Sequence, residues 1–217
     1  MDLIQKYVDH KQIEQVKTME DADTIWMGGA PDEDKWSLIL GKYYFNQFPF
    51  ESCVIMKHNL ADTIQNVFGN TSYLMRTYNL EKSLAEFIGD FKNREKKGED
   101  NLWILKPPNM ARSMDMMITD NLSLIIKAME TGPKIAQKYI ERPVLRQGRK
   151  IDLRYILLVS SIKPLTLYLY KHFWIRSSNN PYTMDRRQLS TYETQFTVMN
   201  YGTVSDFKQI KYKDFIE

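Results

Sequence analysis

The sequence of 217 residues is 43% hydrophobic, which is enough for a sizeable core in one large or two small domains. Its formal net charge of +3 is far from the strongly positive balance of a dedicated nucleic-acid binder, and the single cysteine, Cys53, excludes an internal disulfide. The scattered histidines offer no metal-ligand spacing and no apolar run reaches membrane-spanning length, so we expect a soluble, cytoplasmic protein that engages no membrane.

The amino-terminal part predicts one short strand followed by helices. The strand lies within residues 21–30 and ends in a pair of glycines. This pair is isolated, and because the patterns of a phosphate-binding P-loop and of a dinucleotide-binding turn are both absent, neither of those folds is supported. Apolar residues at helical spacing predict helices over residues 59–68 and 80–92, and the charged residues 93–100 predict a solvated turn.

A short apolar strand is predicted over residues 102–105, and it delivers Lys106 just before two prolines that end it. A lysine at the end of a buried strand either reaches water at the sheet edge or serves a ligand, and the strand alone leaves both interpretations open. The following helix is predicted over residues 121–129, with Thr119 as its N-cap.

Three further strands are predicted in succession. The first covers residues 135–140 and is closed by a proline, which denies the strand its next hydrogen-bond donor. A basic loop over residues 146–150 leads to the second strand, residues 151–161. The third covers residues 165–169 and alternates leucine with polar and aromatic residues, so the last two strands are expected to form an antiparallel hairpin.

The second of these strands carries two charged residues with strand spacing. Asp152 and Arg154 point to the same face because side chains alternate along a strand, and Arg176 lies just beyond the hairpin. Charged residues in sheets are usually solvated, paired or bound to a ligand. Asp152 and Arg154 therefore either neutralise one another on a solvated face or belong to a binding site.

The order of these elements predicts an α/β (α+β) fold of the ATP-grasp type, with mixed sheets and flanking helices. A strand with a terminal lysine is followed by a loop, a helix, a short strand, a basic loop and a long charged hairpin. In ATP-grasp folds a nucleotide lies between two sheets, where lysine and arginine neutralise its phosphates. Cations in a partly dry cleft stabilise phosphate charge and the charge that develops during transfer.

Five segments of the chain also resemble the tubulin-tyrosine ligase-like family. The resemblance covers the chain from about residue 40 to its end, and it implies ATP-grasp ligases that join an amino acid to tubulin or another acidic protein through an acyl phosphate. The segments are NQFPFESCVIMKHNLAD (46–62), WILKPPNMARSMD (103–115), QKYIERPVL (137–145), KIDLRYILLV (150–159) and FTVMNY (196–201).

The resemblance also implies roles for particular residues. It assigns contacts with ATP to one group of residues and contacts with the reacting phosphate and the acidic tail of the acceptor to the catalytic arginines. A contact to the nucleotide phosphates is matched by Lys106, and the strand that lines adenine is matched by Gln137, Lys138, Tyr139 and Ile140. Contacts to ribose and phosphate are matched by Lys150 and Asp152, and part of an H-L-T-N motif is matched by Asn200 together with Thr197. The two catalytic arginines are matched by Arg154 and Arg176.

Two departures from the family pattern weaken the enzymatic interpretation. Residues 109–113 contain no glycine where active members have a flexible glycine-rich loop, so close approach of backbone amides to phosphate is harder. The chain ends at Glu217, before the carboxylates and the asparagine that hold magnesium in the family. We therefore expect an incomplete ATP-grasp fold, with an amino-terminal and linker part over residues 1–100, a central and partial carboxy-terminal part over residues 101–217, and no metal ligands in this chain.

Two classes of function remain, and a third is less favoured. The favoured hypothesis is a non-catalytic or weakly active regulator that binds nucleotide and tubulin, or another protein with an acidic tail. The alternative is an active ATP-dependent ligase that adds an amino acid to such a protein. Nucleic-acid binding through the basic clusters is the least favoured, because no aromatic residues are interleaved with them in an RNA-binding motif.

Overall fold

The computed structural model describes residues 13–110, 115–197 and 210–216, and the chain divides into two compact units, Met1–Ile55 and Met56–Glu217. Asn200, one of the predicted nucleotide contacts, lies outside the described residues. Within the described ranges, no helix combines the length and the apolar character that crossing a membrane requires.

The first unit is built around a small parallel pair of strands, β1 (Thr24–Ile25) and β2 (Tyr44–Phe45). The Asn46 side chain fixes the connection between them, because it accepts from the Met27 amide and donates to the Met27 carbonyl, both at 2.8 Å. The rings of Trp36 and Phe45 pack edge to face with centroids 5.5 Å apart. Three short helical segments complete the unit: η1 (Glu33–Lys35), α2 (Trp36–Ile39) and α3 (Ser52–Ile55).

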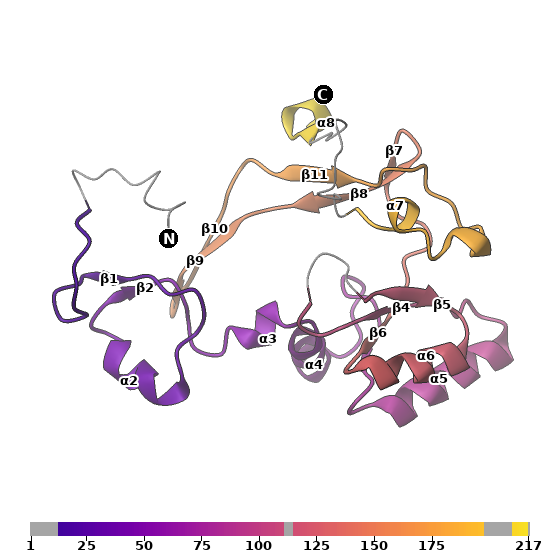
Figure 1. Ribbon diagram of the computed structural model, residues 1–217, viewed down its shortest axis with the longest axis horizontal. Coiled ribbons are helices and arrows are strands. Elements are labelled where there is room, and N and C mark those ends of the chain that lie inside the picture. Colours follow the sequence, from indigo (N-terminus) through magenta and orange to yellow (C-terminus); the bar gives the residue numbers. More distant parts are fainter. Residues whose placement is uncertain (1–12, 111–114, 198–209, 217) are drawn as a thin grey trace. The chain divides into compact units, whose positions relative to one another are not determined.

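The second unit contains a four-stranded antiparallel sheet with the order β3-β6-β4-β5. Trp103 and Leu105 of β4 point to one face of this sheet. There they pack with Phe87 of helix α5 and Ile125 of helix α6, the two helices that cover that face in Figure 1. The strands are β3 (Thr77–Asn79), β4 (Trp103–Lys106), β5 (Met117–Thr119) and β6 (Ile135–Lys138), and the helices are α4 (Lys57–Phe68), α5 (Leu84–Lys97) and α6 (Leu122–Ala128), which continues into η2 (Met129–Thr131).

The other face of this sheet packs against a later part of the chain. Ile104 and Ile118 form one buried cluster with Leu189, and Phe196 packs against the same cluster. These contacts bring the carboxy-terminal segment, which contains η3 (Arg186–Gln188) and α7 (Tyr192–Gln195), onto the face that carries Lys106.

A second four-stranded antiparallel sheet has the order β12-β11-β8-β7, and β9 and β10 form a separate antiparallel hairpin that continues beyond β8 and β11 (Figure 1). The predicted hairpin is thus confirmed. The strands are β7 (Leu145–Arg146), β8 (Arg149–Arg154), β9 (Leu157–Ile162), β10 (Leu165–Leu169), β11 (Trp174–Ser177) and β12 (Ile210–Lys211), followed by α8 (Lys213–Ile216).

The prediction of one continuous strand over residues 151–161 is wrong. β8 ends at Arg154, opposite Trp174, whereas β9 starts at Leu157, opposite Leu169. The break falls where the rings of Tyr155 and Phe173 pack at a tilt with centroids 4.8 Å apart, an aromatic contact that the alternating pattern does not reveal.

Several helix and strand ends also differ from the predictions. α5 starts at Leu84 and continues through the charged residues to Lys97, because Arg94 pairs with Asp90 one turn earlier and Gly98 ends the helix with φ 67°. The N-cap of α6 is Asn121, whose side chain accepts from the Leu124 amide at 3.1 Å. Thr119 does not cap the helix, because its hydroxyl accepts from the amide of Asn121.

Candidate functional site

Lys106 lies at the end of β4, and its ammonium donates to the side-chain oxygen of Gln137 at 2.6 Å. The β4-β6 register explains this contact, because Gln137 is opposite Ile104 and therefore points to the face that Lys106 shares. The amide of Gln137 in turn donates to the hydroxyl of Thr77 on β3 at 2.9 Å. Three strands thus fix the position of one lysine by neutral hydrogen-bonding partners.

Lys150 approaches from the second sheet, where it is part of β8. Its ammonium donates to the Tyr139 hydroxyl at 3.1 Å and lies 4.6 Å from the centroid of that ring. The Tyr139 hydroxyl donates to the buried side chain of Gln195 at 2.6 Å. Gln195 is held by the carbonyl of Thr183, to which it donates at 2.8 Å. Tyr139 therefore joins the two sheets and the helix α7 at one point.

The two lysines are electrostatically coupled and poorly solvated. Burial, and then the charge of Lys57, lower the pKa of Lys106 to about 8. Burial, and then the charge of Lys106, lower the pKa of Lys150 to about 8, although Asp152 partly opposes this shift. Loss of water and a like charge both disfavour the ammonium form. An anion placed between these lysines would restore the charged form of both.

Asp152 is neutralised by Arg176, its cross-strand partner on β11. The guanidinium donates from Nε to Oδ1 at 2.8 Å and from Nη2 to Oδ2 at 2.6 Å, which is the bidentate arrangement that gives strong, directional ion pairs. The hydroxyl of Thr197 also donates to Asp152. The structure thus brings Arg176 and Asp152 together, and Asp152 is paired with Arg176 rather than with Arg154.

Arg154 is exposed at the end of β8, opposite Trp174. Among the residues that the structure describes, none forms a hydrogen bond or an ion pair with its guanidinium. Because side chains alternate along the strand, Arg154 shares the face of Asp152.

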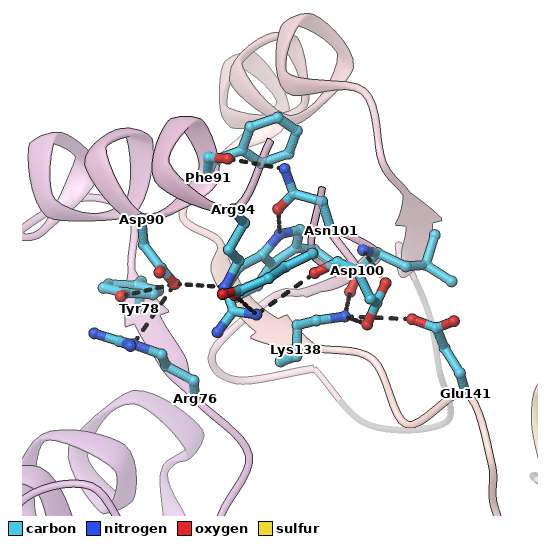
Figure 2. A network of polar contacts seen from close by, with 12 residues as sticks. Arg76, Tyr78, Asp90, Phe91, Arg94, Asp100, Asn101, Lys138 and Glu141 are labelled. Carbon is cyan, nitrogen blue, oxygen red and sulfur yellow. Dashed lines mark hydrogen bonds and ion pairs between the residues drawn. The ribbon is translucent and has the colours of Figure 1, made fainter. Parts of the chain in front are cut away.

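Lys138 belongs to a different set of contacts, which Figure 2 shows. It lies one residue after Gln137 on β6, so its side chain points to the opposite face, toward the ring of Trp103. Its ammonium pairs with Asp100, donates to the carbonyl of Leu102 at 2.8 Å and pairs with Glu141 at 3.4 Å. A hydrogen bond with Asp100, together with burial, raises the pKa of the Glu141 carboxyl.

The rest of this network ties α5 to the sheet. Asp90 accepts from the hydroxyl of Tyr78 at 3.2 Å and from Nε of Arg94 at 3.1 Å, and it pairs with Arg76 at 3.6 Å (Figure 2). These contacts serve the fold on the helix side of the sheet. The side chain of Lys138 is thus separated from Lys106, and Ile140, just past the end of β6, is 49% exposed.

Two residues at this site received no role from the sequence, although Gln195 occupies the position of the histidine in the H-L-T-N motif. Gln195 supports Tyr139, and Lys57 lies close enough to Lys106 to lower its pKa. Lys57 carried a usable signal, because a positive side chain at the first residue of a helix opposes the helix dipole and therefore needs a compensating contact. Within residues 13–110, 115–197 and 210–216, no group of three or more histidine, cysteine, aspartate or glutamate side chains is placed to hold a metal ion.

The sequence pattern of the tubulin-tyrosine ligase family matches residues 41–215. The chain therefore belongs to the tubulin-tyrosine ligase family, and the resemblance predicted from five segments is confirmed. The segments around residues 111–115 and 196–201 carry a likeness to its twelfth member, and relatives with that name match most of the chain.

Two of these relatives are named tubulin--tyrosine ligase-like protein 12. The protein from Caenorhabditis briggsae is 41% identical over 228 residues, and the match covers 98% of this chain and 32% of the relative. The protein from Mus musculus is 44% identical over 178 residues, which covers 79% of this chain and 28% of the relative. Tubulin monoglycylase TTLL3 from Homo sapiens is 38% identical over 95 residues, covering 41% of this chain and 12% of that protein. The chain thus spans about a third or less of the length of these relatives.

Proposed function

We propose that this chain binds the triphosphate of ATP between its two four-stranded sheets, as the nucleotide-binding part of an ATP-grasp fold. The observation that carries the proposal is the pair of Lys106 and Lys150, one from each sheet, each with a pKa lowered to about 8. The neutral side chains of Gln137 and Tyr139 accept their hydrogen bonds. Two poorly solvated cations are costly in a folded protein, and a polyanion removes that cost.

The proposed position of the nucleotide follows the ends of β6 and β8. Adenine would lie along Gln137, Tyr139 and Ile140, where β6 ends, and the ribose and phosphates would lie near Lys150 and Asp152. Lys138 would contribute backbone groups only, because its side chain lies on the other face of the sheet. Asn200 keeps the role that its motif implies. ATP supplies the phosphoryl group that activates a carboxylate, and we assign no magnesium ligand among the described residues.

For the chain as a whole we propose a non-catalytic or weakly active role in tubulin modification, in which nucleotide and tubulin are bound. Residues 109–113 follow Lys106 closely and contain no glycine, which supports weak rather than efficient phosphate transfer. The exposed guanidinium of Arg154 supports binding of an acidic segment of tubulin, or of another protein with an acidic tail. The names of the relatives point to tubulin as the partner.

An active ligase is the second candidate. It is favoured by the likeness to a relative named tubulin monoglycylase and by the bidentate pair of Arg176 and Asp152, which holds one predicted catalytic arginine in a fixed orientation. The two candidates share the nucleotide site. They differ in whether an amino acid is transferred.

Calorimetric titration of the 217-residue chain with ATP, AMP and adenosine, with and without magnesium, tests the nucleotide site. We expect affinity to rise with the number of phosphates, and Lys106→Ala to weaken ATP binding by about 10- to 100-fold, because a hydrogen bond to a charged group contributes on the order of 1.5–3 kcal/mol. Adenosine binding should not change. Lys127→Ala is the matched control, since Lys127 is exposed on α6. Equal ATP affinity for the wild type and Lys106→Ala would overturn the assignment.

A further inference from the structure

Lys57 is the first residue of α4, and its ammonium donates to three backbone carbonyls far away in the sequence. The acceptors are the carbonyls of Pro107 and Pro108, both at 3.2 Å, and of Met110 at 2.8 Å. An ammonium group has three N–H donors, so these contacts account for its whole donor capacity. The three carbonyls belong to the segment that directly follows Lys106.

The position of the Lys57 ammonium is electrostatically unfavourable, so its three hydrogen bonds to carbonyls must offset that cost. A cation at the start of a helix opposes the helix dipole. Burial also lowers the pKa of the Lys57 ammonium, and the charge of Lys57 is near enough to lower the pKa of Lys106. A lysine that merely covered apolar surface would extend its ammonium into water instead.

The segment after Lys106 needs such a partner. The pairing of β4 with β6 ends at Lys106, opposite Ile135, and the next two residues are prolines, which have no N–H to continue a ladder. Carbonyl oxygens left unpaired near a phosphate would also repel it, because both carry negative charge. Binding to Lys57 satisfies these oxygens and offsets their partial negative charge with a cation.

We infer that Lys57 is a positioning residue that anchors the Pro107–Met110 segment and thereby holds Lys106 in place for a phosphate group. The inference rests on the proposed nucleotide site. The return of the chain at Asp115 is held separately, by the buried Lys134, which pairs with Asp115 at 2.5 Å and donates to Thr131 at 3.0 Å. Lys57 therefore binds the start of the connection between β4 and β5, and Lys134 binds its end at Asp115.

Hydrogen–deuterium exchange of the 217-residue chain without nucleotide tests the anchor directly. In Lys57→Met, which keeps the length of the side chain but removes its donors, amides of peptides that contain Asn109 and Met110 should exchange at least fivefold faster than in the wild type. Lys57→Arg should restore most of the protection, because a guanidinium also donates to carbonyl groups. Lys127→Met, at an exposed position on α6, should exchange like the wild type.

ATP titration of the same variants tests the consequence. Lys57→Met should weaken ATP about tenfold and leave adenosine unchanged, and Lys57→Arg should bind ATP within about threefold of the wild type. Unchanged exchange in Lys57→Met would overturn the anchor, and so would equal loss in Lys57→Met and Lys57→Arg. If Lys57→Met unfolds, Lys57→Leu, which also lacks N–H donors, replaces it with the same criteria. A wild type that binds no ATP but shows the exchange pattern would refute the nucleotide site and leave the anchor standing.

Discussion

ATP binding to this chain is expected to take up protons near pH 8. In the free protein, Lys106 and Lys150 each have a pKa of about 8, so each is about half protonated at that pH. Contact with a phosphate raises the pKa of a lysine, because an anion favours the charged form. Both lysines would then be almost fully protonated in the complex, and about one proton would be bound for each ATP.

The same linkage gives the pH dependence of affinity. Between pH 7 and pH 9 the protonated fraction of a group with a pKa of about 8 falls from about 90% to about 10%, which is about tenfold. Because two lysines are involved, ATP should bind up to about a hundredfold more weakly at pH 9 than at pH 7. Affinity is lost as the pH rises because the binding form of each lysine is the protonated one.

Calorimetry at pH 8 in two buffers with different heats of ionisation measures this proton uptake. The phosphates of ATP are already deprotonated at this pH, so the signal reports protein groups. Lys106→Met should take up half a proton or less, because the pKa of Lys150 rises when its cationic neighbour is removed. A binding heat that is independent of the buffer at pH 8, together with a flat affinity between pH 7 and pH 9, would refute the electrostatic reasoning.

Four further outcomes are expected. Lys106→Met should raise the free energy of unfolding at pH 7 by about 1–3 kcal/mol in denaturant titrations, because the lowered pKa makes the charged lysine a cost to folding below pH 8. This gain should shrink as the pH rises from 8 toward 10.5, since wild-type stability increases over that interval. A gain at pH 10.5 equal to the gain at pH 7 contradicts this prediction. Tyr139→Phe should cost about 1–3 kcal/mol of stability, since the buried side-chain oxygen of Gln195 loses its donor. The control Tyr168→Phe, at a tyrosine that is 59% exposed, should cost less than about 0.5 kcal/mol. Equal effects would show that the junction of the two sheets adds no stability. Arg154→Glu should weaken binding of a polyglutamate peptide about tenfold at low salt, whereas the control Lys127→Glu should bind it like the wild type. The wild-type affinity for the peptide should fall with added salt. Binding that is insensitive to both salt and Arg154→Glu argues against this surface. Incubation with tubulin, ATP, magnesium and radiolabelled tyrosine, glutamate and glycine should give no more incorporation than a Lys106→Ala control, and incorporation above that control would favour the ligase.

The strand with a terminal lysine and the antiparallel hairpin could be predicted from sequence because each depends on local order. Apolar residues followed by Lys106 and two prolines define the end of β4, and the alternation around residues 157–169 defines the hairpin. Strand alternation also predicted that Asp152 and Arg154 share a face, and it left open whether they pair with one another or belong to a binding site. The partner of Asp152 in the structure is Arg176, which the β8-β11 register places opposite it although it lies 24 positions further along the chain, so this pairing required the structure.

Features that depend on long-range packing could not be predicted. The break between β8 and β9 coincides with the contact of Tyr155 with Phe173, and the junction at Tyr139 depends on Gln195, 56 positions away. The anchoring of residues 107–110 by Lys57 is a contact between side chain and backbone, which leaves no periodic pattern in a sequence.

The alternation along β6 places two chemically independent environments on adjacent residues. Gln137 serves the lysine on one side of the sheet, whereas Lys138 serves the carboxylates on the other, although one peptide bond joins them. Substitutions at these neighbours should therefore have effects that do not correlate: Gln137 should govern ligand affinity, and Lys138 should govern the attachment of residues 100–102 to the sheet. Inserting a single residue before β6 would exchange the two sides at once, so this strand should tolerate replacement of its side chains far better than a change in its length.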